Sequence, residues 1–134
     1  MNGERGSVTL FIVLLATAIL GLGGVVNDAG AALVSARRVT DIAETAARAG
    51  VQAGTAPDAA GAARLDPQQA RQAAANFLAG QGLRGDVRAD AGRVEVTVRL
   101  QQPTTLLRAV GITHLDVSGT GVARPLLGVT EAQR

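Results

Sequence analysis

The 134-residue sequence contains no cysteine, lysine, tyrosine or tryptophan, and phenylalanine occurs only as Phe11 and Phe77. Without cysteine the chain forms no disulfide bond and offers no thiolate ligand to a metal. Stacking platforms for nucleic acids need several aromatic side chains, so two phenylalanines argue against a nucleic-acid partner. All 13 basic residues are arginine, and nothing titrates between histidine and arginine, so a net charge of only +2 goes with a pI near 10.9. The high pI is therefore no sign of a nucleic-acid-binding surface.

Groups that could form a catalytic or ligand-binding site are also sparse. His114 is the only histidine and is predicted to be a surface residue near the start of a strand. Asp86, Asp90 and Asp116 could meet at one end of a sheet, but acids in hairpins are usually solvated. A phosphate-binding P-loop is excluded because the chain has no lysine to complete it. Since catalysis needs convergent titratable groups, we predict no catalytic residue, cofactor, metal site or small-molecule substrate.

Residues 7–26, SVTLFIVLLATAILGLGGVV, form a long uncharged run. As a helix these residues would span about 30 Å, the thickness of the hydrocarbon core of a bilayer. The small residues at 29–31 fit the cleavage site of an export signal, but the apolar part of such signals is only about 7–15 residues long. We therefore predict an uncleaved transmembrane helix over 7–26, with cleavage after Ala31 as the alternative. Residues 1–6 are a short terminus easily left in the cytoplasm while the rest is exported.

The helix is predicted to continue as an amphipathic helix over residues 27–53. Opposite charges are spaced i,i+4 along one side, in the pairs Arg37–Asp41 and Glu44–Arg48. Because small side chains let helices approach closely, the other side is a candidate packing surface. It is expected to cover the chain's own C-terminal domain, to pack against helices of other subunits, or to do both along different lengths. We call this surface the alanine face; it consists of Ala29, Ala32, Ala36, Ala43, Ala46, Ala47 and Gly50.

Residues 54–134 are predicted to form a small extracytoplasmic domain that begins with a loop over 54–64. A second helix follows, with Asp66 as its N-cap and Pro67 in its first turn. Its apolar residues recur at helical spacing, and Gly80 or Gly82 ends it. The apolar face of this helix comprises Ala70, Ala73, Ala74, Phe77 and Leu78.

Three antiparallel strands are predicted after this helix. Residues 94–100 alternate between apolar and polar, which indicates a half-buried strand, and a tight turn at 90–92 joins it to a preceding strand. Residues 104–110 are expected to form a short helix. In the third strand Gly119 and Gly121 fall on the apolar face, where glycine permits close approach of another backbone, so we expect a helix to cross the sheet there. The predicted fold class is α+β: a long N-terminal helix, a short second helix and a small antiparallel sheet.

Several features follow one another between Glu4 and Gly54. They are the motif Arg5-Gly6-Ser7-Val8, the apolar helix, Asp28, the pair Arg37-Arg38 and the alanine-rich run from Asp41 to Gly50. In this order they resemble the Flp pilus assembly TadE/TadG-like family, small pilin-like membrane proteins of the Tad secretion and pilus machinery. The resemblance implies a noncatalytic structural role in the bacterial cytoplasmic membrane. It also implies an N-terminus inside, a C-terminal domain outside, and pilin-like or secretion-system subunits as partners.

The resemblance also bears on processing. Pseudopilin-type members are cut after a glycine by a prepilin peptidase, and here the cut would fall between Gly6 and Ser7. Processed members carry a glutamate five residues beyond the cut, where this sequence has Phe11. The chain therefore looks more like the TadG-type, membrane-retained branch. The alternative function is that of a free-standing single-pass membrane protein whose exported domain binds a ligand or partner, as a sensor or adaptor does.

Overall fold

The computed structural model describes residues 3–125, and it confirms an α+β fold with one long N-terminal helix. That helix, α1, runs without interruption from Gly3 to Gly54. The remaining elements are β1 (Thr55–Pro57), β2 (Ala63–Leu65), α2 (Pro67–Gly80), β3 (Gly85–Ala89), β4 (Val94–Pro103), the 3-10 helix η1 (Leu107–Val110) and β5 (His114–Ala123).

The chain divides into two compact units, and α1, β4 and β5 contribute residues to both. Among the described residues, the first unit combines 3–35 with Gln101–Asp116, and the second combines Ala36–Leu100 with 117–125. Each unit thus joins a part of α1 to a part of the chain that follows much later in the sequence.

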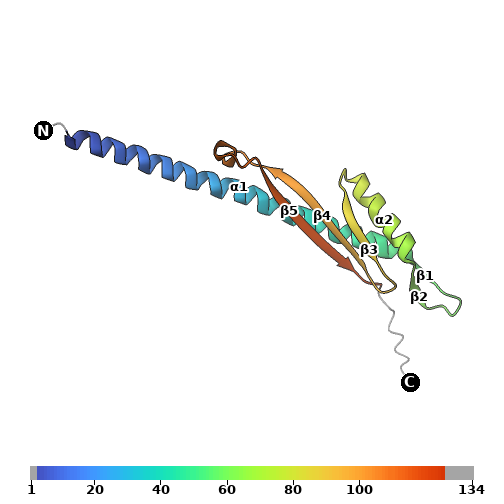
Figure 1. The fold of residues 1–134 in the computed structure, drawn as a ribbon. Coiled ribbons are helices and arrows are strands. Elements are labelled where there is room, and N and C mark those ends of the chain that lie inside the picture. Colours follow the sequence, from blue (N-terminus) through green and yellow to red (C-terminus); the bar gives the residue numbers. More distant parts are fainter. Residues whose placement is uncertain (1–2, 126–134) are drawn as a thin grey trace, which may run out of the picture. The chain divides into compact units, whose positions relative to one another are not determined.

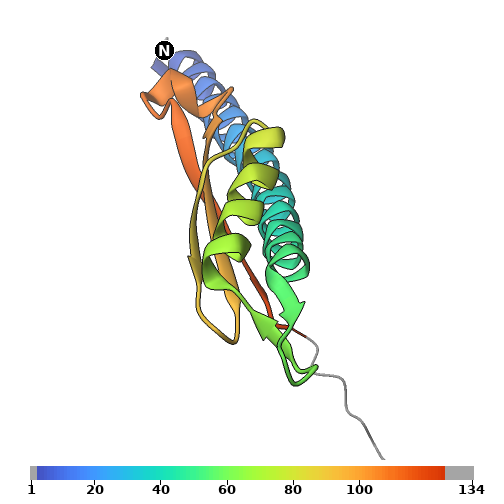
Figure 2. The same ribbon diagram turned by 90° about the vertical axis from the view of Figure 1, so that its right-hand side faces the viewer.

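The second unit has two layers, a three-stranded antiparallel sheet and the two helices on one of its faces (Figures 1 and 2). The strand order is β3-β4-β5, and β3 pairs with β4 in the register Ala89↔Val94. The predicted tight turn joins these strands, where Asp90 accepts hydrogen bonds from the backbone N–H groups of Gly92 and Arg93 at 2.8 and 2.9 Å. The hairpin prediction is confirmed.

The core of this unit is built from valine, alanine and leucine. The alternation predicted for β4 is confirmed, because Val94, Val96 and Val98 are fully buried while Arg99 is exposed. Phe77 is only half-buried at the edge of the cluster. Since such side chains are small, the layers must lie close together to exclude water. The buried cluster comprises Val39, Ala43, Ala46, Ala47, Val51, Leu65, Ala70, Ala74, Leu78, Val94, Val96 and Val98.

Glycines in β5 allow α1 to lie directly against the sheet, as predicted. A β-carbon at Gly119 would lie 2.6 Å from the Cα atom of Thr40. A β-carbon at Gly121 would overlap the backbone nitrogen of Glu44 and the carbonyl carbon of Ala43. The helix that crosses the sheet is therefore the second half of α1.

The second helix begins and ends as predicted. The Asp66 side chain accepts hydrogen bonds from the backbone N–H groups of Gln68 and Gln69 at 2.8 and 3.2 Å, and Pro67 occupies the first turn. The helix packs closely on α1, because a β-carbon at Gly54 would lie 2.8 Å from the β-carbon of Ala70. Glycine on α1 thus sets the spacing between the two helices.

The prediction of a loop over residues 54–64 was wrong in part, since β1 and β2 form a small antiparallel hairpin there. Their sequences, TAP and ARL, are too short and too mixed to show the alternation that marks a strand. The side chain of Asp58 closes the turn by accepting from the backbone N–H groups of Ala60 and Ala62, both at 2.9 Å. Gly61 supplies the left-handed conformation, with φ of 80°.

We expect Gly121→Ala to destabilise the second unit by about 1–3 kcal/mol, because its methyl group would collide with the backbone of α1 rather than with a movable side chain. The midpoint of urea-dependent proteolysis of the full-length protein in mild detergent measures this change.

Gly80→Ala is the matched control. A β-carbon there meets nothing within 4 Å, and alanine in place of glycine in a helix is neutral or favourable by up to about 1 kcal/mol. Equal urea midpoints for the two variants would contradict the close approach of α1 to β5.

Candidate functional site

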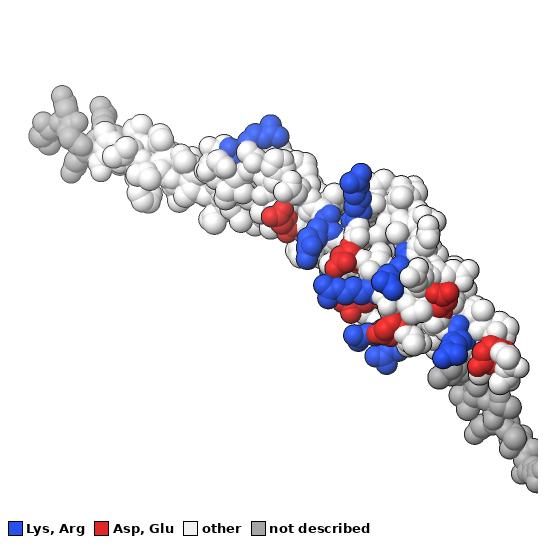
Figure 3. All heavy atoms as spheres, turned by 45° about the vertical axis from the view of Figure 1, so that its right-hand side comes forward, with Lys and Arg blue, Asp and Glu red and all other residues white. Residues whose placement is uncertain are grey.

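The first part of α1 is apolar and exposed along its length. Residues 6–54 form a helix long and apolar enough to cross a membrane, and the most apolar window has a mean hydropathy of 2.5 with only 6% of its residues buried. In Figure 3 the part of α1 that follows the grey residues carries neither acidic nor basic side chains, whereas both kinds are interspersed over the residues around the sheet. Exposed, charge-free surface of this kind suits lipid rather than water. The large exposed side chains include Phe11, Ile12, Leu14, Ile19, Leu20, Leu22 and Val26.

The alanine face has different surroundings along its length. Ala43, Ala46 and Ala47 are 0% exposed, and Gly50 is buried, where a β-carbon would lie 2.8 Å from Ala70 O and 3.3 Å from Val94 Cγ1. This half of the face covers the chain's own domain. Towards the N-terminus, Ala32 and Ala36 are half-buried and Ala29 is exposed. A role for these three residues in packing against other subunits stays a prediction.

Asp28 is the one buried acidic residue among those described, with 3% of its surface exposed. Its carboxylate accepts three backbone hydrogen bonds, from the N–H groups of Thr105, Leu106 and Leu107, at 3.0, 2.9 and 2.7 Å. These are the N–H groups at the start of η1, which have no partner within the helix itself. A side chain of α1 thus caps a helix that lies 77–79 residues later in the chain.

Further contacts hold the same loop, residues 104–113, which we call the β4–β5 loop. The side chain of Leu106 covers Gly24, where a β-carbon would lie 3.0 Å from it. The buried Thr104 closes the loop, donating from its backbone to Thr113 O at 3.0 Å and from its hydroxyl to Ile112 O. The expected helix over 104–110 is confirmed only in its second part, as the 3-10 helix η1, and it ends as expected before Gly111, which has a φ of 91°.

Hydrogen bonding favours the charged form of Asp28, which lies beyond the apolar run 7–26. The N–H group of Leu107, with smaller contributions from Thr105 and Leu106, holds the pKa of the carboxyl below its ordinary value of 3.8, although burial acts in the opposite direction. The residue is therefore ionised at neutral pH, when its charge strengthens the capping bonds.

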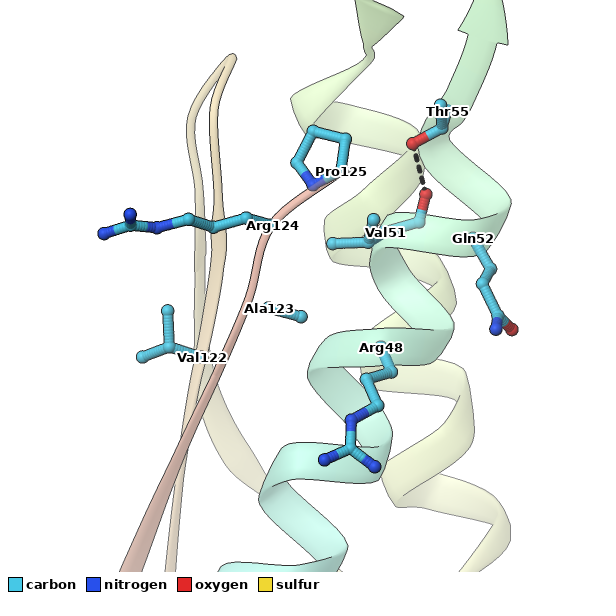
Figure 4. A pocket seen from close by; sticks show the side chains of 8 residues that line it. All are labelled: Arg48, Val51, Gln52, Thr55, Val122, Ala123, Arg124 and Pro125. Atoms are coloured by element: carbon cyan, nitrogen blue, oxygen red, sulfur yellow. Dashed lines mark hydrogen bonds between the residues drawn. The ribbon is translucent and has the colours of Figure 1, made fainter. Parts of the chain in front are cut away.

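An open groove in the second unit lies between the C-terminal part of α1 and the end of β5 (Figure 4). Two arginines line it, but they do not converge. Arg48 lies along α1 and pairs with Glu44 at 3.0 Å, whereas Figure 4 shows Arg124 pointing away from the helix. The two arginines of the lining therefore do not form a binding site for a single anion. The groove is lined by Arg48, Val51, Gln52, Thr55, Val122, Ala123, Arg124 and Pro125.

The structure also places the other candidate groups. His114 is exposed and lies 2.9 Å from the Thr113 hydroxyl. The suggestion that three acids meet at one end of the sheet was wrong, since Asp86 and Asp90 lie at opposite ends of β3. Each pairs with a nearby arginine, at 3.3 and 3.4 Å. Within residues 3–125 no cluster of three or more His, Asp or Glu residues is arranged to hold a metal ion.

The sequence did not predict the role of Asp28. Its position after the apolar run is visible in the sequence, but its partners are backbone N–H groups, which every residue except proline carries. One signal could have indicated this role. An acidic residue directly after the apolar run of a helix is costly to bury unless its carboxylate is hydrogen-bonded, so its position suggests a hydrogen-bonding partner. Gly6 and Ser7, the candidate processing residues, lie exposed within α1.

Comparison with known proteins bears on α1. Residues 6–53 match the model of a protein family described as putative Flp pilus-assembly TadE/G-like. The matched segment lies wholly within α1, and over this segment the resemblance identified in the sequence is confirmed. No curated protein and no solved structure matches the chain.

We expect Asp28→Ala to loosen the start of the β4–β5 loop. Amide hydrogen exchange at residues 105–107 should rise about tenfold or more, because those N–H groups lose a charged acceptor. In the unaltered protein, the protection that the Asp28 carboxylate gives is fully present above the ordinary carboxyl pKa and is lost as the pH falls through the depressed pKa of the folded state. Protection should therefore be constant between neutral pH and about pH 5.

Asp90→Ala is the matched control, since Asp90 also caps a turn by accepting backbone hydrogen bonds. It should raise exchange at residues 92 and 93 and leave residues 105–107 unchanged. If Asp28→Ala has no larger effect on 105–107 than this control, the capping role of Asp28 is wrong.

Proposed function

We propose that this chain is a noncatalytic, pilin-like structural or assembly component of a Tad (Flp) type pilus or secretion system. The observation that carries the proposal is the coincidence of the family match over residues 6–53 with a continuous helix, exposed and apolar at its start and packed on a sheet at its end. Residues 7–26 anchor the chain in the bacterial cytoplasmic membrane. The N-terminus lies inside and residues 54–134 lie outside.

The contacts of Asp28 support retention of the helix as an anchor. Cleavage after Ala31 would remove both Gly24 and Asp28, and with them the surface and the cap that hold the β4–β5 loop. Three backbone N–H groups would lose their acceptor, which is costly where water does not replace it. A segment that the folded protein uses in this way is unlike a disposable export signal.

The burial pattern of the alanine face restricts where partner helices can contact α1. Ala43, Ala46 and Ala47 are covered by the chain's own domain and have no surface left for another subunit. Leu33 and Val34, by contrast, are 64% and 69% exposed just beyond the anchor. Together with the exposed Ala29 they give apolar surface that is open to a second helix. We assign the contact with pilin-like or secretion-system subunits to this part of α1, residues 29–34.

Cysteine crosslinking in native membranes tests this assignment. Because the sequence has no native cysteine, any crosslink must involve the introduced residue. We expect Leu33→Cys to form disulfide-linked dimers under mild oxidation if two copies pack through this surface. With a cysteine in another pilus-system protein, we expect a disulfide or, after addition of a short bifunctional reagent, a crosslinked adduct. Mass spectrometry identifies the adduct. Ala43→Cys serves as the control, because a side chain that is 0% exposed is shielded from a partner.

Monomer alone at position 33, with the protein well expressed, would contradict packing through residues 29–34. Adducts with proteins unrelated to pili or secretion would instead support a free-standing single-pass adaptor. Neighbouring genes for a secretion ATPase and polytopic platform proteins separate these two functions independently of the crosslinking.

Intact mass of the protein purified from membranes tests processing. We expect residues 1–6 to remain on the chain, because Phe11 stands where processed family members carry glutamate. We expect residues 7–31 to remain as well, because they include Asp28, which caps the β4–β5 loop. A chain that starts at Ser7 would show prepilin-type cleavage and place it in the pseudopilin branch. A chain that starts at Ala32 would overturn the anchor.

A further inference from the structure

The tip of the β4–β5 loop carries bulky apolar side chains that the protein leaves uncovered. Leu106, Val110 and Ile112 are 50%, 74% and 45% exposed. The sequence of the loop, TTLLRAVGIT, contains no acidic residue, and its single charge is Arg108. An exposed group of this composition indicates a surface that meets something other than water.

The position of the loop on α1 indicates what that surface meets. Leu106 lies on Gly24, which belongs to the uncharged run 7–26, and the cap on the loop is Asp28, two residues beyond that run. Both contacts are internal to the first compact unit. The backbone of the loop therefore lies beside α1 at the level where the apolar run ends (Figure 1).

Backbone groups of the loop are hydrogen-bonded within the protein, as surroundings with little water require. Asp28 pairs the three N–H groups at the start of η1, and Thr113 and Ile112 accept from Thr104. Backbone groups that enter the edge of a bilayer need internal partners of this kind. Arg108 has a stem long enough to keep its guanidinium at the level of lipid phosphates while the neighbouring side chains point into the acyl region.

We propose that the β4–β5 loop inserts into the lipid leaflet through which α1 leaves the membrane, with Leu106, Val110 and Ile112 among the acyl chains. The protein then has two membrane contacts, the transmembrane helix and this shallow wedge. Asp28 lies between them and ties the wedge to the helix.

Depth-dependent fluorescence tests the proposal on the full-length protein. Val110→Cys is labelled with an environment-sensitive NBD fluorophore, and the protein is reconstituted into vesicles of phosphatidylcholine and phosphatidylglycerol. We expect blue-shifted emission, quenching by lipids brominated near the headgroup, and an iodide quenching constant about threefold or more below that of an aqueous site. Since Val110 is 74% exposed, the label displaces no packing.

Two labelled positions serve as references. Ala91→Cys, in the exposed β3–β4 turn, reports an aqueous site, and Leu14→Cys, in the middle of the apolar run, reports a deep one. A label at 110 that behaves like the label at 91 overturns the proposal. A label at 110 that is shielded from iodide but not quenched by any brominated lipid also overturns it, because protein rather than lipid then covers the loop.

Discussion

The backbones of α1 and β5 touch, and the second unit is organised around that contact. At Gly119 and Gly121 no side chain stands between strand and helix, so the distance between the two layers is set by main-chain atoms. The same principle holds between α1 and α2, where Gly50 and Gly54 lie against Ala70. A core with one half-buried aromatic residue gains cohesion from many close contacts between small groups, since dispersion forces fall off steeply with distance. Close approach thus compensates for the small size of each buried side chain.

A single helix serves two different surroundings, and Asp28 marks the change from one to the other. Before it the exposed side chains are almost all apolar, and after it charged residues such as Arg37, Asp41 and Arg48 occupy the exposed side. A carboxylate at such a boundary is costly unless it is paired, and the three amide groups of the β4–β5 loop pair it. Within the first unit, the apolar part of α1 and the β4–β5 loop are therefore joined by side-chain hydrogen bonds.

Much of the fold was predictable because its signals are local. Three predictions depended on patterns of only a few residues, and all three were confirmed. They are the helix cap at Asp66, the alternating strand over 94–100 and the close approach of a helix at the glycines of β5. The β1–β2 hairpin was missed because strands of three residues carry no period. The partner of Asp28 was missed because backbone amides look alike in any sequence. Which half of the alanine face would be covered was also beyond the sequence, since alanine suits its own sheet and a foreign helix equally well.

The sequence separation between Asp28 and its hydrogen-bond partners affects the order in which the protein folds. The ribosome adds Asp28 77–79 residues before it makes the amides that pair this carboxylate, and α1 is complete by Gly54. Contacts between residues so distant in the chain form late, because closing a long loop costs entropy before any contact repays it. Until those amides are made, the carboxylate of Asp28 lacks its partners in the β4–β5 loop, whereas α2, which is made earlier, can already cover Gly50 and Gly54. The β4–β5 loop and β5 therefore pack on a helix that was made earlier, and a truncation that removes β5 takes away the strand that lies against Thr40 and Glu44.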